Sequence, residues 1–159
     1  MRRNGSVVEG GFFAGLSGGL AVALWMMLMR VLQGANAWPA VKGASFPFLG
    51  ERAFEPGFDG LAVSLGLVAH FGVSIFWGLL FAVAFDGLSR LGTVFAGLFW
   101  GLVVWVGMYY VVLPLAGAGE ISRGPIAPAV VSHLIFGLFV ALGYLPFQRP
   151  AEARREVRP

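Results

Sequence analysis

Two histidines are the only titratable side chains deep inside the apolar stretches of this sequence. His70 and His133 lie in separate runs that carry no charged residue. Imidazoles on two different helices are the minimum that can hold one haem iron by both axial positions, and Gly72 and Gly137 nearby would leave room for a flat ring. Two other interpretations stay open: a proton or solute path, and rings that simply bond a hydroxyl or a backbone carbonyl of a neighbouring helix. In each case we expect both rings to face other helices, because hydrocarbon offers an imidazole no partner.

The sequence contains no recognisable motif for other catalytic or metal-binding chemistry. There is no cysteine, so disulfides, thiolate metal sites and thiol nucleophiles are excluded. The sequence has no Gly-rich phosphate loop followed by Lys, no HExxH pair and no GxSxG motif. No carboxylate accompanies the two histidines in the apolar runs, so no metal site is expected. We therefore expect a protein that is not an enzyme and has no cofactor, with haem held by the two histidines as the alternative.

The elements that must position these histidines are membrane-spanning helices. Of the 159 residues, 58% are hydrophobic and 12% are charged, against about 25% charged residues in soluble domains. Charged residues are absent from 10–29, 60–85, 91–119 and 124–148, and each run is long enough for the roughly 20 apolar residues of a spanning helix. The sequence predicts an all-α, four-helix transmembrane bundle forming one domain over residues 1–147. We place the spans at 11–32, 61–85, 93–115 and 127–147.

The basic residues predict the orientation of these spans. Four spans leave both termini on one side, together with the turn between the second and third spans. That side carries seven of the Lys and Arg residues, and the opposite side carries four. Cytoplasmic segments are enriched in Lys and Arg, so we expect both termini in the cytoplasm. The same distribution explains the net charge of +3 without nucleic-acid binding.

The glycines predict where the helices touch. Small residues let helix backbones approach closely in lipid, where apolar side chains gain nothing by leaving the hydrocarbon. Five glycines recur every fourth residue on one face of the first and third spans, and we assign them to helix packing: Gly11, Gly15, Gly19, Gly97 and Gly101.

The chain also reads as a helical hairpin that occurs twice. FAGLSGGL (13–20) and FAGLFWGL (95–102) agree at six of eight positions, and GLLFAVA from Gly78 matches GLFVALG from Gly137 in character. The two hairpins would run in the same direction, related by an axis along the membrane normal.

The connections differ in length and character. The turn between the second and third spans is short, so these spans should be antiparallel neighbours. The long first connection, 33–60, is rich in aromatic residues, proline and glycine. We expect it at the outer headgroup level or folded over the outer mouth of the bundle. Residues 148–159 form a polar cytoplasmic tail.

Three blocks carry a family resemblance: AHFGVSIFWGLLFA (69–82), VVLPLAGAG (111–119) and APAVVSHLIFG (127–137). They resemble a family of small four-span bacterial inner-membrane proteins described only as a domain of unknown function. The resemblance covers the second to fourth spans, and His70 and His133 fall within it. It implies a multi-pass protein of the bacterial inner membrane and supplies no activity, substrate or cofactor.

The functional expectation follows from these features together. We expect a non-enzymatic interaction or accessory module whose partners are the lipid bilayer and other membrane proteins or further copies of the chain. Two alternatives remain: a small transporter or channel with a path near His70 and His133, and a b-type haem electron carrier that uses the same pair.

Overall fold

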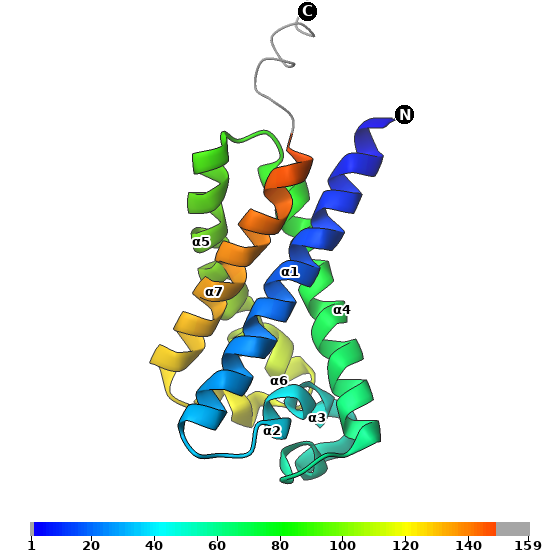
Figure 1. Ribbon diagram of the computed structural model, residues 1–159, viewed down its shortest axis with the longest axis vertical. Coiled ribbons are helices and arrows are strands. Elements are labelled where there is room, and N and C mark those ends of the chain that lie inside the picture. Colours follow the sequence, from blue (N-terminus) through cyan, green and yellow to red (C-terminus); the bar gives the residue numbers. More distant parts are fainter. Residues whose placement is uncertain (1, 149–159) are drawn as a thin grey trace, which may run out of the picture.

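The computed structural model describes residues 2–148, and this part of the chain is helical without any strand (Figure 1). The long helices are α1 (Arg2–Leu32), α4 (Gly60–Phe85), α5 (Arg90–Gly107) and α7 (Ile126–Tyr144). Four segments are long and apolar enough to cross a membrane: Val7–Leu32, Gly60–Phe85, Arg90–Leu115 and Ile126–Phe147. The predicted four-helix architecture is confirmed, with the largest difference at the first span, which begins before residue 11. Of the predicted tail, only Gln148 is described, and 149–159 lie outside the described residues.

Local sequence explains where these helices begin and end. The Asp59 carboxylate accepts hydrogen bonds from the amides of Leu61 and Ala62, both at 3.1 Å, and so caps α4. Ser89 caps α5 in the same way by accepting from the Gly92 amide. Gly34 ends α1 with a φ of 69°, the left-handed conformation that glycine adopts without steric cost.

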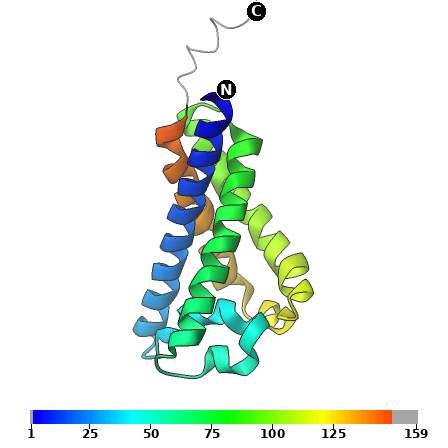
Figure 2. The same cartoon turned by 90° about the vertical axis from the view of Figure 1, so that its right-hand side faces the viewer.

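The four helices lie in the order α4, α1, α7, α5 around the molecule. α1 packs along α4 on one side and along α7 on the other, and α5 packs along α7. α4 and α5 are joined by the short turn 86–89, yet they share few contacts, because α5 leans away from α4 towards the end that carries the long loop (Figure 2). The predicted antiparallel neighbours therefore share few backbone contacts, and the side chains of Trp77 and Trp100 bridge them away from the turn.

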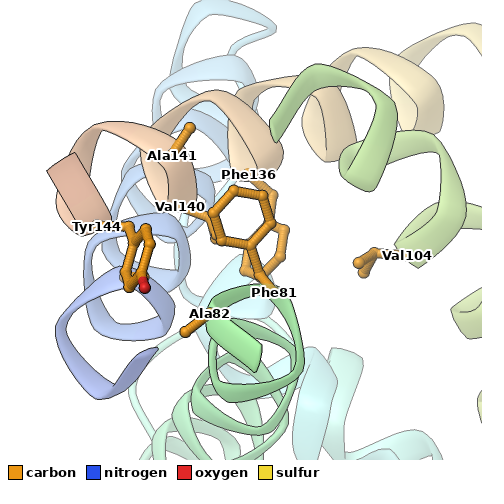
Figure 3. Packing of buried hydrophobic residues seen from close by; sticks show 8 residues of the cluster. Phe81, Ala82, Val104, Phe136, Val140, Ala141 and Tyr144 are labelled. Atoms are coloured by element: carbon orange, nitrogen blue, oxygen red, sulfur yellow. The ribbon is translucent and has the colours of Figure 1, made fainter. Parts of the chain in front are cut away.

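The core lies between the helices in the half of the molecule nearer the turn. Its largest fully buried side chains are Phe81 from α4 and Tyr144 from α7, with Val140 beside them (Figure 3). The Tyr144 hydroxyl donates to the Asp86 carboxylate at 3.0 Å, which fastens the end of α7 to the turn between α4 and α5. The start of α1 and the end of α7 lie at this same end of the molecule (Figure 1).

The two hairpins share one pattern of backbone contact. A methyl group on Gly78 would meet Gly11 and Gly15 of α1, and one on Gly137 would meet Gly97 and Gly101 of α5. The matched pairs are therefore Gly11 with Gly97 and Gly15 with Gly101. The sequence alignment, which set Gly15 on Gly97, is one helical turn out of register. α1 carries three of these glycines, and the first two, Gly11 and Gly15, make this contact. Sequence similarity alone does not indicate which two of the three are used.

The long loop is folded into short helices beneath the ends of α1 and α4. It contains α2 (Trp38–Lys42), the 3-10 segment η1 (Gly43–Ser45), α3 (Phe46–Leu49) and the 3-10 segment η2 (Gly50–Phe54). Gly66 of α4 allows the backbone of Val41 and Lys42 to approach. Lys42 is buried, and its ammonium donates to the Glu55 carbonyl at 2.6 Å. The loop thus covers the ends of α1 and α4, and its place on the outer side of the membrane stays a prediction.

The third span is not a continuous α-helix. It passes from α5 through a π-helical turn, η3 (Met108–Val112), into α6 (Leu113–Leu115), and the 3-10 segment η4 (Gly119–Arg123) follows. Pro114 accounts for the change, because its ring would clash with the carbonyl of Tyr110 in a regular helix. Widening the turn avoids that clash. The fourth span ends in a similar short segment, η5 (Leu145–Phe147).

Candidate functional site

His70 lies at the contact between α4 and α1. Its Nε2 is 2.8 Å from the carbonyl oxygen of Gly19, and its ring packs edge-on against Phe71. Because a carbonyl only accepts, Nε2 is the protonated nitrogen. Gly19 has no side chain, so the imidazole can reach the α1 backbone directly. His70 thus faces a protein partner on a neighbouring helix, as the sequence predicted.

His133 lies at the contact between α7 and the π-helical turn of the third span. Its Nδ1 is 2.8 Å from the carbonyl oxygen of Ala129, one turn earlier on the same helix. The ring meets Tyr109 edge to face, with 5.8 Å between ring centroids. Since Nδ1 donates to the carbonyl, the neutral imidazole has its lone pair on Nε2.

The structure does not bring the two histidines together. His70 belongs to the α1/α4 pair and His133 to the α5/α7 pair, and α4 and α7 share few contacts. In the matched hairpins the counterpart of His133 is Ser74, so the two imidazoles are not equivalent positions of the repeat. Haem held by both rings would need them to face each other across one gap, whereas each is turned onto a carbonyl of a different helix pair.

A row of aromatic and polar side chains beside His133 was not found from the sequence. Trp105 packs against Tyr109 with 6.2 Å between ring centroids, and Tyr109 also packs against His133. The indole nitrogen of Trp105 is buried and has no acceptor among the described residues. The available clue was Pro114, because a proline inside an apolar span disturbs the helix before it. We call Trp105, Tyr109 and His133 the π-turn cluster.

All five glycines assigned to packing lie where a second helix passes closely. A methyl group on Gly15 would meet the backbone of Ser74 and Ile75, and one on Gly101 would meet the backbone of His133 and Leu134. Backbone atoms cannot rotate away as a side chain can. A side chain at either glycine would therefore force two helices apart.

A groove follows the outer surface where α1 and α7 diverge. It has a volume of about 450 Å³, and its α1 wall runs from Ser17 to Leu28. The α1 side includes the small residues Ser17 and Ala21, one turn apart. The rest of its lining is apolar: Leu20, Leu24, Trp25, Leu28, Ile135 and Phe139.

Charged groups gather at the loop end, outside the spans. The Arg52 guanidinium forms an ion pair with the Asp59 carboxylate at 2.7 Å. This hydrogen bond, together with the amides of the α4 cap, lowers the pKa of Asp59 below its ordinary value, and the pKa of Arg52 is raised in turn. Glu120 and Arg123 form a second, more exposed pair. Within residues 2–148, no group of three or more His, Asp or Glu side chains is placed to hold a metal ion.

Comparisons of the chain with protein-family models, with curated proteins and with solved structures give no match. The family resemblance of the three sequence blocks stays a prediction.

Proposed function

We propose that the chain is a multi-pass protein of the bacterial inner membrane, with both termini in the cytoplasm, that acts without catalysis as an interaction module. The four apolar helices support the membrane location, and the family resemblance supports the inner membrane. The excess of Lys and Arg on the side of the termini supports the orientation. A C-terminal fusion to a phosphatase that works only in the periplasm should be inactive, and an active fusion would reverse the orientation.

The groove between α1 and α7 is the observation that carries the interaction role. Among its lining residues, Ser17 and Ala21 are small and lie one turn apart on α1, a spacing that favours close helix approach in lipid. The α1 wall from Ser17 to Leu28 spans roughly 17 Å at 1.5 Å per residue, about three helical turns. The groove also continues the glycine contact of α1 with α7, since Gly143 already packs on Ser17. We assign it to a transmembrane helix, supplied by another membrane protein or by a second copy of this chain.

Photo-crosslinking in native membranes tests this assignment. A photoreactive residue replaces Leu24, which is 58% exposed in the groove, or Val68, which is 73% exposed on α4. Each lies eight residues from the loop-side end of its helix, so the two probes have matched depth. We expect a discrete protein adduct at Leu24 and none at Val68.

A variant that fills the groove completes the test. Ala21→Phe should abolish the Leu24 adduct, whereas Ala127→Phe, at an exposed position on the first turn of α7, should leave it intact. The mass of the adduct distinguishes a second copy from another protein. Equal adducts at both probes, adducts with lipid alone, or an adduct that survives Ala21→Phe would each contradict the proposal.

The haem alternative has a direct test of its own. Protein purified from membranes that supply haem should show no Soret absorbance, because each imidazole already holds a backbone carbonyl. A Soret band that disappears in both His70→Ala and His133→Ala would reinstate the electron carrier.

A further inference from the structure

The third span contains backbone carbonyls without their usual partners. At the π-helical turn the Leu113 amide donates to the Met108 carbonyl, five residues back, in place of the Tyr109 carbonyl. Pro114 has no amide hydrogen, so the Tyr110 carbonyl also loses the donor that a regular helix would supply. Two consecutive carbonyls near the outer end of the span are therefore without the standard intrahelical donor.

A side-chain donor and a side-chain acceptor lie close to this turn. The indole N–H of Trp105 is buried and has no acceptor among the described residues. His133 donates through Nδ1 to Ala129, which leaves the lone pair of Nε2 as an acceptor. Tyr109 contacts both rings and adds a hydroxyl group. The π-turn cluster thus combines donors and acceptors that complement a small hydrogen-bonding molecule.

The membrane setting determines what that molecule must be. Unpaired backbone groups do not persist against hydrocarbon, and irregular backbone at membrane depth occurs only where protein buries it or water reaches it. Protein covers this turn only in part, because the side chains of Tyr110 and Val111 are 66% and 52% exposed. Buried polar groups that lack a protein partner are commonly satisfied by ordered water.

We propose that water enters the membrane from the loop side along the outer part of the third span and reaches Trp105. Trp105 lies ten residues before Leu115, which places it roughly 15 Å from the outer end of the span at 1.5 Å per residue. That depth is about half of the 30 Å hydrocarbon core. The π-turn cluster forms the inner end of this water inlet, with His133 on its wall.

The absence of cysteine makes a thiol accessibility experiment direct. Single variants Tyr109→Cys and His133→Cys place a thiol in the inlet, and Val106→Cys and Val131→Cys place one at similar depth on exposed faces of α5 and α7. A membrane-impermeant methanethiosulfonate reacts only with the thiolate, and hydrocarbon keeps a thiol protonated. Gln33→Cys, exposed after α1, measures full reactivity.

The expected rates separate the two environments. Tyr109→Cys and His133→Cys should react within about tenfold of Gln33→Cys, and the two valine positions at least about 100-fold more slowly, because each unit of thiol pKa rise lowers the thiolate fraction tenfold. Inlet positions that react as slowly as Val106→Cys and Val131→Cys would overturn the proposal.

A measurement on the unmodified chain guards against misfolded variants. The Trp100 indole N–H is held by the Trp77 carbonyl at 3.2 Å, so it serves as the internal control for Trp105. After transfer into D2O, the indole proton of Trp105 should exchange at least about tenfold faster than that of Trp100. Equal or slower exchange at Trp105 would show that water does not reach its indole N–H group, and it would refute the proposed inlet.

Discussion

Two seams join the hairpins of this protein, and they differ although the internal repeat relates them. One hairpin is α1 with α4, the other is α5 with α7, and a seam is a contact between a helix of one and a helix of the other. A rotation that superposes the two hairpins would place the α1/α7 seam on the α4/α5 seam. The α1/α7 seam is close, because Gly18 admits Val140 and Phe136, and Gly143 admits the backbone of Ala14. The α4/α5 seam is wide and is filled by Trp77 and Trp100, whose ring centroids are 5.7 Å apart.

Side-chain size at matched positions accounts for the difference. Counting from the glycines that the two hairpins share, the counterparts of Gly18, Phe136 and Val140 are Val104, Trp77 and Phe81. Each of these three residues of α4 and α5 is thus larger than its counterpart. A helix pair with glycines can bring backbones together, whereas a tryptophan between helices sets their separation. Internal similarity therefore repeats the contact within each hairpin but not the contact between hairpins.

The largest effect should come from filling the close seam. In Gly143→Leu the new side chain would collide with Ser17 and with backbone atoms of Ala14 and Phe13. We expect a loss of about 3 kcal/mol in the free energy of unfolding, at the upper end for overpacked contacts. Thermal unfolding in detergent measures it. Gly72→Leu is the control, because its added methyl meets nothing within 4 Å, and equal losses in both variants would contradict the seam argument.

A smaller effect is expected in the wide seam. Trp77→Phe keeps an aromatic ring but removes the hydrogen bond from Nε1 to the Met108 sulfur at 3.4 Å. It also removes part of the contact with Trp100. We expect a loss of roughly 1–2 kcal/mol, less than for complete truncation of a buried aromatic residue. Phe76→Leu, at an exposed position beside it, should change detergent stability little, and a larger loss there than for Trp77→Phe would count against the seam.

A double-mutant cycle sharpens the claim that Trp77 is the spacer. A methyl group on Gly107 would lie 3.0–3.1 Å from the outer atoms of the Trp77 indole. Gly107→Ala alone should therefore be destabilising, and in the Trp77→Phe background, where those atoms are gone, it should become neutral or stabilising. The expected coupling is about 0.5 kcal/mol or more. Additive losses would show that Trp77 does not set the distance between α4 and α5.

The smallest effect concerns the loop end of α4, where the wide seam opens. Arg52 and the α4 cap lower the pKa of Asp59, so the ionised carboxylate stabilises the folded form. That contribution is fully present above the ordinary pKa of Asp and is lost as pH falls through the lowered one. Hydrogen exchange of the Leu61 and Ala62 amides should accelerate, after correction for intrinsic rates, over this acidic range. Asp59→Asn should remove the dependence, and a dependence that persists in that variant would assign it to another group.

Much of the architecture could be predicted because membrane-spanning helices have a simple sequence pattern. Charged residues are excluded from about 20 consecutive positions wherever a helix crosses hydrocarbon, so the four spans are visible in the chain itself. The need for close backbones in lipid likewise marks Gly15 and Gly101 before any helix is placed. An imidazole without a hydrogen-bond partner in hydrocarbon has a large free-energy cost, so His70 and His133 are predicted to face protein partners.

The tertiary structure alone decided which partners those are. His70 bonds Gly19 on another helix, while His133 bonds Ala129 on its own helix and meets Tyr109 across a widened turn. Neither the one-turn offset between the hairpins nor the unequal seams can be read from the chain. Both depend on which side chains interlock between helices distant in sequence. Whether a glycine allows close packing, or a tryptophan holds two helices apart, depends on the residues that face it.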